Sequence, residues 1–377
     1  MEFGKSPIEP NPLFCTGGSA RGDGDAESLF SSSNSAFRID SAAFVRAMQT
    51  PVYSAPESVN QTRVCFTTGL SFFAACAKMK PSHHRRMKDM KTSTSLEHGI
   101  RMARIGAYDS ACMMKIAGFD GVDLAMDAHS TEPEIIAQSA WREHIVDQAN
   151  DLKRAGLSLA QCHLPYYPGH IALPGDGTWQ AFEDFMLPSY IRALDVCGEI
   201  GCPVAVLHPF FDEKSASLTR EGNLRMTEKM LPLLEKNHVK LALENVYGLN
   251  YADSHVARAE DIMPIIEKID HPLVGACIDT GHANIFHLDI AEMARIYGKK
   301  LFALHVNGNA GKDEHIIPYT SSGWCEKMDY HAFTRALGEI GYDGYYNLEV
   351  ASGDLGADVA LPFYIYAGAV ARSLSRI

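Results

Sequence analysis

The sequence is poor in three features that would assign it to other classes of protein. Its nine cysteines are scattered, odd in number and form no Cys-X-X-Cys pair, which argues against a disulfide framework and a structural zinc knuckle. No apolar run reaches the roughly 20 residues that a membrane-spanning helix requires. Positive charge is also in deficit, because 34 Lys and Arg face 46 Asp and Glu, for a net charge of −12. We therefore expect a protein of the reducing cytoplasm that binds no membrane and, since phosphate contacts require Lys and Arg, no nucleic acid.

From residue 91 onward, short apolar runs alternate with amphipathic stretches. This alternation is typical of strand–helix units and a parallel sheet. Strands are predicted over 91–96, 121–126, 157–163, 204–208, 241–244, 274–279, 301–305 and 345–349. Helices are predicted over 100–117, 132–155, 179–200, 221–236, 257–269, 290–297, 330–340 and 357–372. Eight such units favour a (β/α)8 TIM barrel; a doubly wound sheet less readily explains metal-ligand side chains at the ends of six strands.

The first part of the chain has a different composition. Residues 1–60 are rich in Ser, Gly, Pro, Ala and Asn and show no sustained period, which is typical of a poorly structured segment. The apolar stretch 64–77 lies too far from the N-terminus to be read as a secretory signal. We therefore expect residues 1–89 to form a poorly structured N-terminal extension and residues 90–377 to form the barrel domain.

Each of the last four predicted strands ends in a side chain that can bind a metal: Glu244, Asp279, His305 and Glu349. In a barrel of parallel strands, the side chains at the C-terminal strand ends converge on one site. Three carboxylates and an imidazole suit Mn²⁺, Mg²⁺, Co²⁺ or Zn²⁺ and leave positions open for substrate oxygens. A single acid at a strand end is often a helix cap or an ion-pair partner, but four ligands at matching positions favour a metal site.

The segments around these four residues resemble those of the xylose isomerase-like superfamily of TIM barrels. The similar strings are Leu243–Val246, Ile278–His282, His305–His315 and Leu348–Val350. The superfamily contains sugar and sugar phosphate isomerases and epimerases, together with the endonuclease IV family. The resemblance covers about residues 90–377 and implies a small carbohydrate substrate and one divalent metal ion.

In ketose epimerases of this superfamily a Glu–Asp–His–Glu set holds the metal, and the four strand-end residues match it. The resemblance further implies that Glu244 and Glu349 form the acid/base pair on opposite faces of the sugar. Removing a proton next to a ketone creates an enediolate, which a metal ion stabilises, and the second carboxylate can return the proton. His282 matches a family histidine that contacts a substrate oxygen, although a loop histidine or a helix cap is the alternative interpretation.

Five further side chains are expected near the substrate: His163, His208, Lys312, Asp313 and His315. All of them except Lys312 belong to a nine-position pattern that resembles the trinuclear zinc site of endonuclease IV. That pattern leaves open a zinc phosphodiesterase that acts at abasic DNA sites. Many sugar isomerases of the superfamily keep the same strings with one metal, so substrate contact or support of the metal ligands is the preferred interpretation. The alternatives are buried core histidines and a solvated loop.

Two departures from the family pattern leave the substrate undetermined. The family's Pro-Gly-X-Gly loop is replaced by Pro318–Gly323, and the usual substrate-facing arginine after the seventh strand is absent, with Lys312 nearby. Tyr166, Tyr167 and Trp324 are candidates for an apolar wall against a sugar ring. A barrel that keeps a metal only for stability, or that binds carbohydrate without turnover, is the non-enzyme alternative. A homo-oligomer is compatible with the sequence.

Overall fold

The computed structural model describes residues 89–97, 105–126, 133–166, 178–320, 328–351 and 356–376. Eight strands form one parallel sheet in the order β7-β6-β5-β4-β3-β2-β1-β8. They are β1 (Lys91–Ser95), β2 (Gly121–Ala125), β3 (Ser158–His163), β4 (Val204–Leu207), β5 (Lys240–Glu244), β6 (Val274–Asp279), β7 (Leu301–His305) and β8 (Tyr345–Leu348). The expected extension, residues 1–89, lies outside the described residues apart from Asp89.

The sheet closes on itself between β7 and β8. Val306, directly after β7, forms a parallel bridge with Leu348. Its backbone N–H donates to the carbonyl oxygen of Asn347 at 2.8 Å, and the N–H of Glu349 donates back to the Val306 oxygen at 3.1 Å. The predicted (β/α)8 barrel is therefore confirmed.

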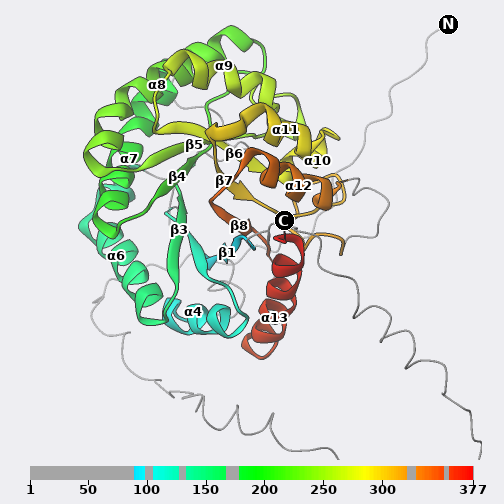
Figure 1. The fold of residues 1–377 in the computed structure, drawn as a ribbon. Helices are drawn as coiled ribbons and strands as arrows, with labels where there is room; N and C mark the ends of the chain where they lie inside the picture. Colours follow the sequence, from blue (N-terminus) through cyan, green and yellow to red (C-terminus); the bar gives the residue numbers. More distant parts are fainter. Residues whose placement is uncertain are drawn as a thin grey trace, which may run out of the picture. The chain divides into compact units, whose positions relative to one another are not determined.

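Helices surround the strands (Figure 1). The α-helices are α4 (Ala107–Ile116), α5 (Pro133–Ile136), α6 (Ser139–Arg154), α7 (Trp179–Ile200), α8 (Ala216–Asn237), α9 (Ala259–Ile269), α10 (Thr280–Ile285), α11 (Ile290–Tyr297), α12 (Tyr330–Ile340) and α13 (Ala357–Leu374). Two 3₁₀ turns, η1 (Leu249–Tyr251) and η2 (Gly298–Lys300), complete the set described. None of the described helices is long and apolar enough to cross a membrane.

Three of the predicted helix boundaries are wrong, and each error has a local cause. Within the described residues, the predicted helix 100–117 is helical only from Ala107, because Gly106 has extended backbone angles. The predicted helix 132–155 is interrupted, since Gln138 is extended and separates α5 from α6. Helix α8 starts five residues before the predicted Glu221, because the Ser215 hydroxyl accepts a hydrogen bond from the Leu218 N–H and caps it.

The core has two parts, because successive side chains of each strand point to opposite faces. The larger part fills the space between the sheet and the helices. A small cluster fills the barrel interior: Val204, Val206, Ala242, Cys277 and Ala303. These residues precede the C-terminal ends of their strands, so an apolar layer lies directly beneath the polar side chains at the strand ends.

Candidate metal and active site

The four predicted metal ligands come together at the C-terminal ends of β5 to β8. Glu244, Asp279 and His305 are the last residues of their strands, and Glu349 directly follows β8. One ligand atom from each residue lies within 4.8 Å of the ligand atoms of the other three. The parallel register of the strands accounts for this, because it pairs Glu244 with Cys277 and Asp279 with His305 on neighbouring strands.

His305 lies between the two glutamates. Its Nδ1 atom is 3.1 Å from Glu244 Oε1 and 3.3 Å from Glu349 Oε2. His305 Nδ1 and both Glu244 oxygens are buried and make no hydrogen bond. Buried polar atoms without partners are costly, and a cation bound among them would satisfy all three. The donor set therefore fits a divalent metal ion of the carboxylate- and imidazole-binding class.

The two glutamates differ in their electrostatic surroundings. Burial raises the pKa of Glu349 to about 7, against the opposing effect of His305 and His315. Burial also acts on Glu244, but the nearby imidazoles of His305 and His208 outweigh it and hold the pKa of Glu244 well below its usual value. The site thus contains one glutamate that is ionised at neutral pH, Glu244, and one that can carry a proton near neutral pH, Glu349.

A buried hydrogen-bond network that the sequence analysis missed fixes His305 at Nε2, the ring nitrogen that faces away from the glutamates. His305 Nε2 is hydrogen-bonded to Asp123 Oδ2 at 3.1 Å. The same oxygen accepts hydrogen bonds from Gln161 Nε2 at 2.9 Å and Asn347 Nδ2 at 3.1 Å. Asp123 Oδ2 accepts all of these bonds, so His305 donates its Nε2 proton to it and directs Nδ1 toward the glutamates. A charged residue in the middle of the apolar strand Gly121–Ala125 was the available signal.

Asp279 is positioned by two asparagines. The side chain of Asn245 bonds both backbone groups of Asp279, accepting from its N–H at 2.8 Å and donating to its carbonyl oxygen at 2.9 Å. Asn307 Nδ2 donates to Asp279 Oδ2 at 2.9 Å, and the other carboxylate oxygen accepts from the His282 N–H at 2.7 Å. Asp279 is therefore both a candidate ligand and the N-cap of α10, a short helix that the sequence analysis did not predict.

His163 and His208 lie beside Glu244, as expected from their positions at the ends of β3 and β4. Their Nε2 atoms are 3.6 and 3.4 Å from Glu244 Oε2, and 3.1 Å from each other. His163 is buried, and its ring stacks on that of His305 with centroids 5.4 Å apart. Tyr166 packs against both histidines, with centroid distances of 5.6 and 5.0 Å.

A second polar group lies on the other side of Glu244 and contains His282, Asp313 and His315. Asp313 Oδ1 is 2.9 Å from His315 Nε2 and 3.7 Å from His282 Nε2. Tyr247 supports the group, because its hydroxyl donates to Asp313 Oδ2 at 2.8 Å. His315 has φ of 49°, an uncommon backbone conformation for a non-glycine residue that is often found at functional sites.

Other predicted site residues are placed less completely. Lys312 is exposed in the loop after β7, and among the described residues no hydrogen bond or ion pair joins it to the site. Tyr167 and Trp324 lie outside the described residues, as does the second half of the 318–323 loop. Their contact with substrate stays a prediction.

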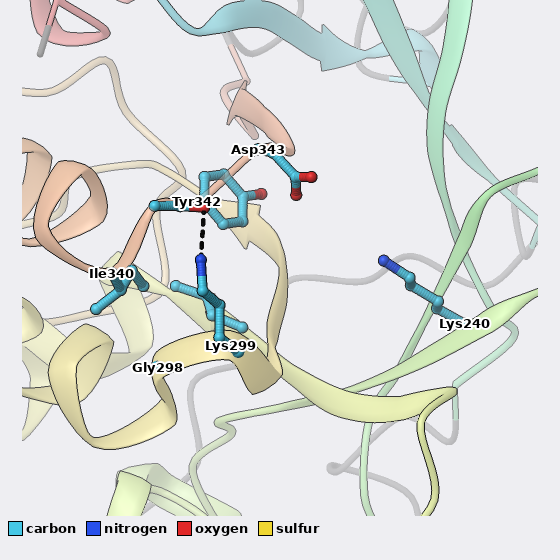
Figure 2. A pocket seen from close by; sticks show the side chains of 8 residues that line it. Lys240, Gly298, Lys299, Ile340, Tyr342 and Asp343 are labelled. Carbon is cyan, nitrogen blue, oxygen red and sulfur yellow. Dashed lines mark hydrogen bonds between the residues drawn. The ribbon is translucent and has the colours of Figure 1, made fainter. Parts of the chain in front are cut away.

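A separate hollow of about 200 Å³ lies at the opposite ends of the strands. Its lining includes Lys240 and Leu301, the first residues of β5 and β7. Figure 2 shows Lys299 beside it, donating a hydrogen bond to the Gly341 carbonyl oxygen. In these barrels the chemistry occurs at the C-terminal strand ends. The polar cluster, and not this hollow, is therefore the candidate active site.

Comparison with solved structures finds the same fold in several proteins. The chain is similar to 3-keto-D-glucoside 4-epimerase YcjR from E. coli, with 19% identity and a TM-score of 0.54 over 75% of this chain and 99% of that one. It is similar to D-allulose 3-epimerase from Methylomonas sp., with 17% identity and a TM-score of 0.55 over 76% and 96%. A putative xylose isomerase from Rhodospirillum rubrum gives 16% identity and a TM-score of 0.61 over 75% and 99%.

Comparison of the sequence with a known relative and with a family model identifies the family to which the chain belongs. The uncharacterized protein y4fM of Sinorhizobium fredii is 23% identical over 167 residues, a match that spans 41% of this chain and half the length of that relative. The model of the family described as xylose isomerase-like TIM barrel matches residues 114–364. The match covers most of the barrel and contains all ten predicted site residues, from His163 to Glu349. The chain belongs to the xylose isomerase-like TIM barrel family.

Proposed function

We propose that residues 90–377 form a divalent-metal-dependent isomerase or epimerase that acts on a sugar or sugar phosphate. The observation that carries the proposal is the position of Glu244 and Glu349 on either side of His305, within ligand distance of one another and of Asp279. Structural neighbours that are named as sugar epimerases support the reaction class. The metal would be Mn²⁺, Mg²⁺, Co²⁺ or Zn²⁺, held by these four residues.

The reaction that suits the two glutamates is proton transfer at a carbon next to a carbonyl group. One carboxylate oxygen takes the proton, and the bond's electron pair moves to the carbonyl oxygen, which gives an enediolate. The bound cation would supply positive charge that stabilises developing negative charge on substrate oxygens. The other glutamate returns a proton, and delivery to the opposite face inverts the carbon centre.

The surrounding histidines are suited to orient the sugar hydroxyls. On one side of Glu244 lie His163 and His208, and on the other lie His282, Asp313 and His315. Lys312 is assigned to the same role on its place in the loop. We expect a small carbohydrate as the partner and no nucleic acid, because the chain carries a net charge of −12.

Solvent exchange of the substrate's α-proton tests this role. Glu349→Gln keeps the size of the side chain but cannot transfer a proton, so we expect a folded, metal-binding protein that no longer exchanges the α-proton of a bound ketose. Glu339→Gln, on the exposed face of α12, is the matched control and should retain exchange. Full exchange by the Glu349→Gln protein would remove the proposed acid/base pair.

One observation favours a second candidate, a zinc phosphodiesterase of the endonuclease IV type. The donors form three groups: His163/Glu244/His305, Glu244/Asp279/His305/Glu349 and His282/Asp313/His315. Three groups can accommodate three ions, whereas the proposed isomerase uses one. Metal analysis of the purified chain separates the candidates, since one bound ion per chain favours the isomerase and three favour the phosphodiesterase.

A further inference from the structure

Three cysteines meet on the far side of β3 from the candidate active site. Cys162 belongs to β3, Cys197 to the end of α7, and Cys202 to the short segment between α7 and β4. Cys162 precedes His163, and neighbouring side chains on a strand point to opposite faces. The three cysteines lie in the core between the sheet and the helices, so this cluster is separate from the carboxylate and imidazole site.

The three sulfur atoms are already close to metal-binding geometry. They lie within 4.8 Å of one another, and the exposed fractions of the three residues are 0%, 0% and 3%. Metal–sulfur bonds of about 2.3 Å place the sulfurs of a three-coordinate site roughly 4 Å apart. Closing the cluster around an ion therefore requires shifts of less than about 1 Å per side chain.

A fourth sulfur adjoins the cluster. Met126, which directly follows β2, is fully buried, and its Sδ atom lies 3.8 Å from Cys197 Sγ. Its place is fixed on both sides, since its N–H donates to the His163 oxygen at 2.8 Å and its carbonyl oxygen accepts from Trp141 Nε1 at 3.0 Å. Thiolate and thioether sulfurs are soft ligands that select Cu(I), whereas the carboxylates and imidazoles of the active site suit harder dications.

We propose that Cys162, Cys197 and Cys202, with Met126 as an additional weak ligand, form a buried soft-metal site that takes one Cu(I) ion. The five described cysteines, which include these three, are free. Each thiol that binds releases its proton to solvent, so three thiolates around one Cu(I) ion give a site of charge −2. Cys202 gives up the hydrogen bond that its Sγ donates to the Val204 oxygen at 3.0 Å. The ion would join β3 to the end of α7 and to the start of β4.

Simple packing is the competing explanation, because buried cysteines often behave as small apolar side chains. Titration of the reduced full-length chain with Cu(I), buffered by bicinchoninate, distinguishes the two. We expect the wild type to bind one more equivalent than Cys162→Ala/Cys197→Ala and to gain a higher thermal midpoint on binding. Cys112→Ser, which removes a half-buried thiol on α4, should bind like the wild type. The cysteines at positions 15, 65, 76 and 325 are present in all three proteins, so any Cu(I) that they bind does not affect the difference in stoichiometry.

Equal Cu(I) binding by the wild type and the double variant would overturn the proposal. Circular dichroism establishes first that the double variant is folded. If it is not, Cys202→Ser replaces it with the same expectations, because it exchanges one sulfur for an oxygen at the cluster's edge. Met126→Leu keeps the apolar volume and should retain the stoichiometry but weaken Cu(I) binding, whereas an unchanged affinity would remove Met126 from the site.

Discussion

Asp123 Oδ2 lies 3.1 Å from Nε2 of His305, on the side of the imidazole opposite the two glutamates. The pair joins β2 to β7 across the barrel interior, and both side chains are almost fully buried. Such a carboxylate fixes the orientation and tautomer of a metal-binding histidine and raises its basicity. Asp123 is therefore a positioning residue for the proposed metal site.

Asp123→Asn should weaken metal binding by about 10- to 100-fold, the range found when such outer partners are replaced. The amide has no negative charge and can turn its NH₂ group toward Nε2, which disfavours the required tautomer. A Mn²⁺ titration of the folded protein measures the effect. Asp120→Asn is the matched control directly before the same strand, where Asp120 accepts a hydrogen bond from the Thr92 N–H, and it should leave Mn²⁺ affinity unchanged. Equal affinities for the two variants would show that Asp123 does not position His305.

The sequence predicted the barrel because its signals are local. Apolar runs with a metal-binding residue at the end identified β5 to β8, and parallel pairing alone brings those ends together. The support around His305 has only a weak local signal, the charged Asp123 inside an apolar strand, which does not show its partner: Asp123 is 182 positions away from His305, and Asn347 is 224 positions from Asp123. Such contacts are set by barrel closure, which short segments of sequence do not encode.

Backbone detail around the site was also beyond prediction. Helix α10 has only six residues, too few for a hydrophobic period to reveal, and it is recognisable only through Asp279 acting as its cap. The positive φ of His315 depends on the return of its loop, where Gly308 and Ile316 form an antiparallel bridge. The sequence could place His315 near the site but could not give its orientation.

Gly281→Ala should damage the metal site without touching a ligand. A Cβ atom at Gly281 would lie 1.9 Å from Asn307 Oδ1, so Asn307 must move, and its Nδ2 holds Asp279 at 2.9 Å. We expect weaker Mn²⁺ binding and a loss of about 1–3 kcal/mol in unfolding free energy, typical of overpacking. Denaturant melts and metal titration measure the two effects. Gly106→Ala, where nothing lies within 4 Å of the added atom, should affect neither, and an unaltered Gly281→Ala protein would contradict the proposed role of Asn307.

Tyr247→Phe should raise KM more than it lowers kcat. The variant removes the hydrogen bond that positions Asp313 through its Oδ2 atom. A hydrogen bond to a charged group is worth about 1.5–3 kcal/mol, which is the upper limit of the lost binding energy, so KM should rise by at most about 10- to 100-fold. The measurement is steady-state kinetics with the sugar that proves to be the substrate. Tyr251→Phe is the control, because the Tyr251 hydroxyl is only a distant acceptor, 3.5 Å from the Asp313 N–H. A fall in kcat with unchanged KM would instead place the Asp313 group in the chemical step.

Removal of the metal should destabilise the fold as well as abolish activity. Without a cation, Glu244 and Asp279 remain buried close to Glu349, and a ligand at 100 times its Kd stabilises the folded state by about 2.7 kcal/mol. For a domain of this size that corresponds to a fall of roughly 5 °C in Tm after treatment with EDTA. Added Mn²⁺ should restore both Tm and activity. In Asp279→Ala, which removes one ligand side chain, the EDTA-induced shift should be much smaller, and an equal shift in both proteins would mean that the stabilising ion binds elsewhere.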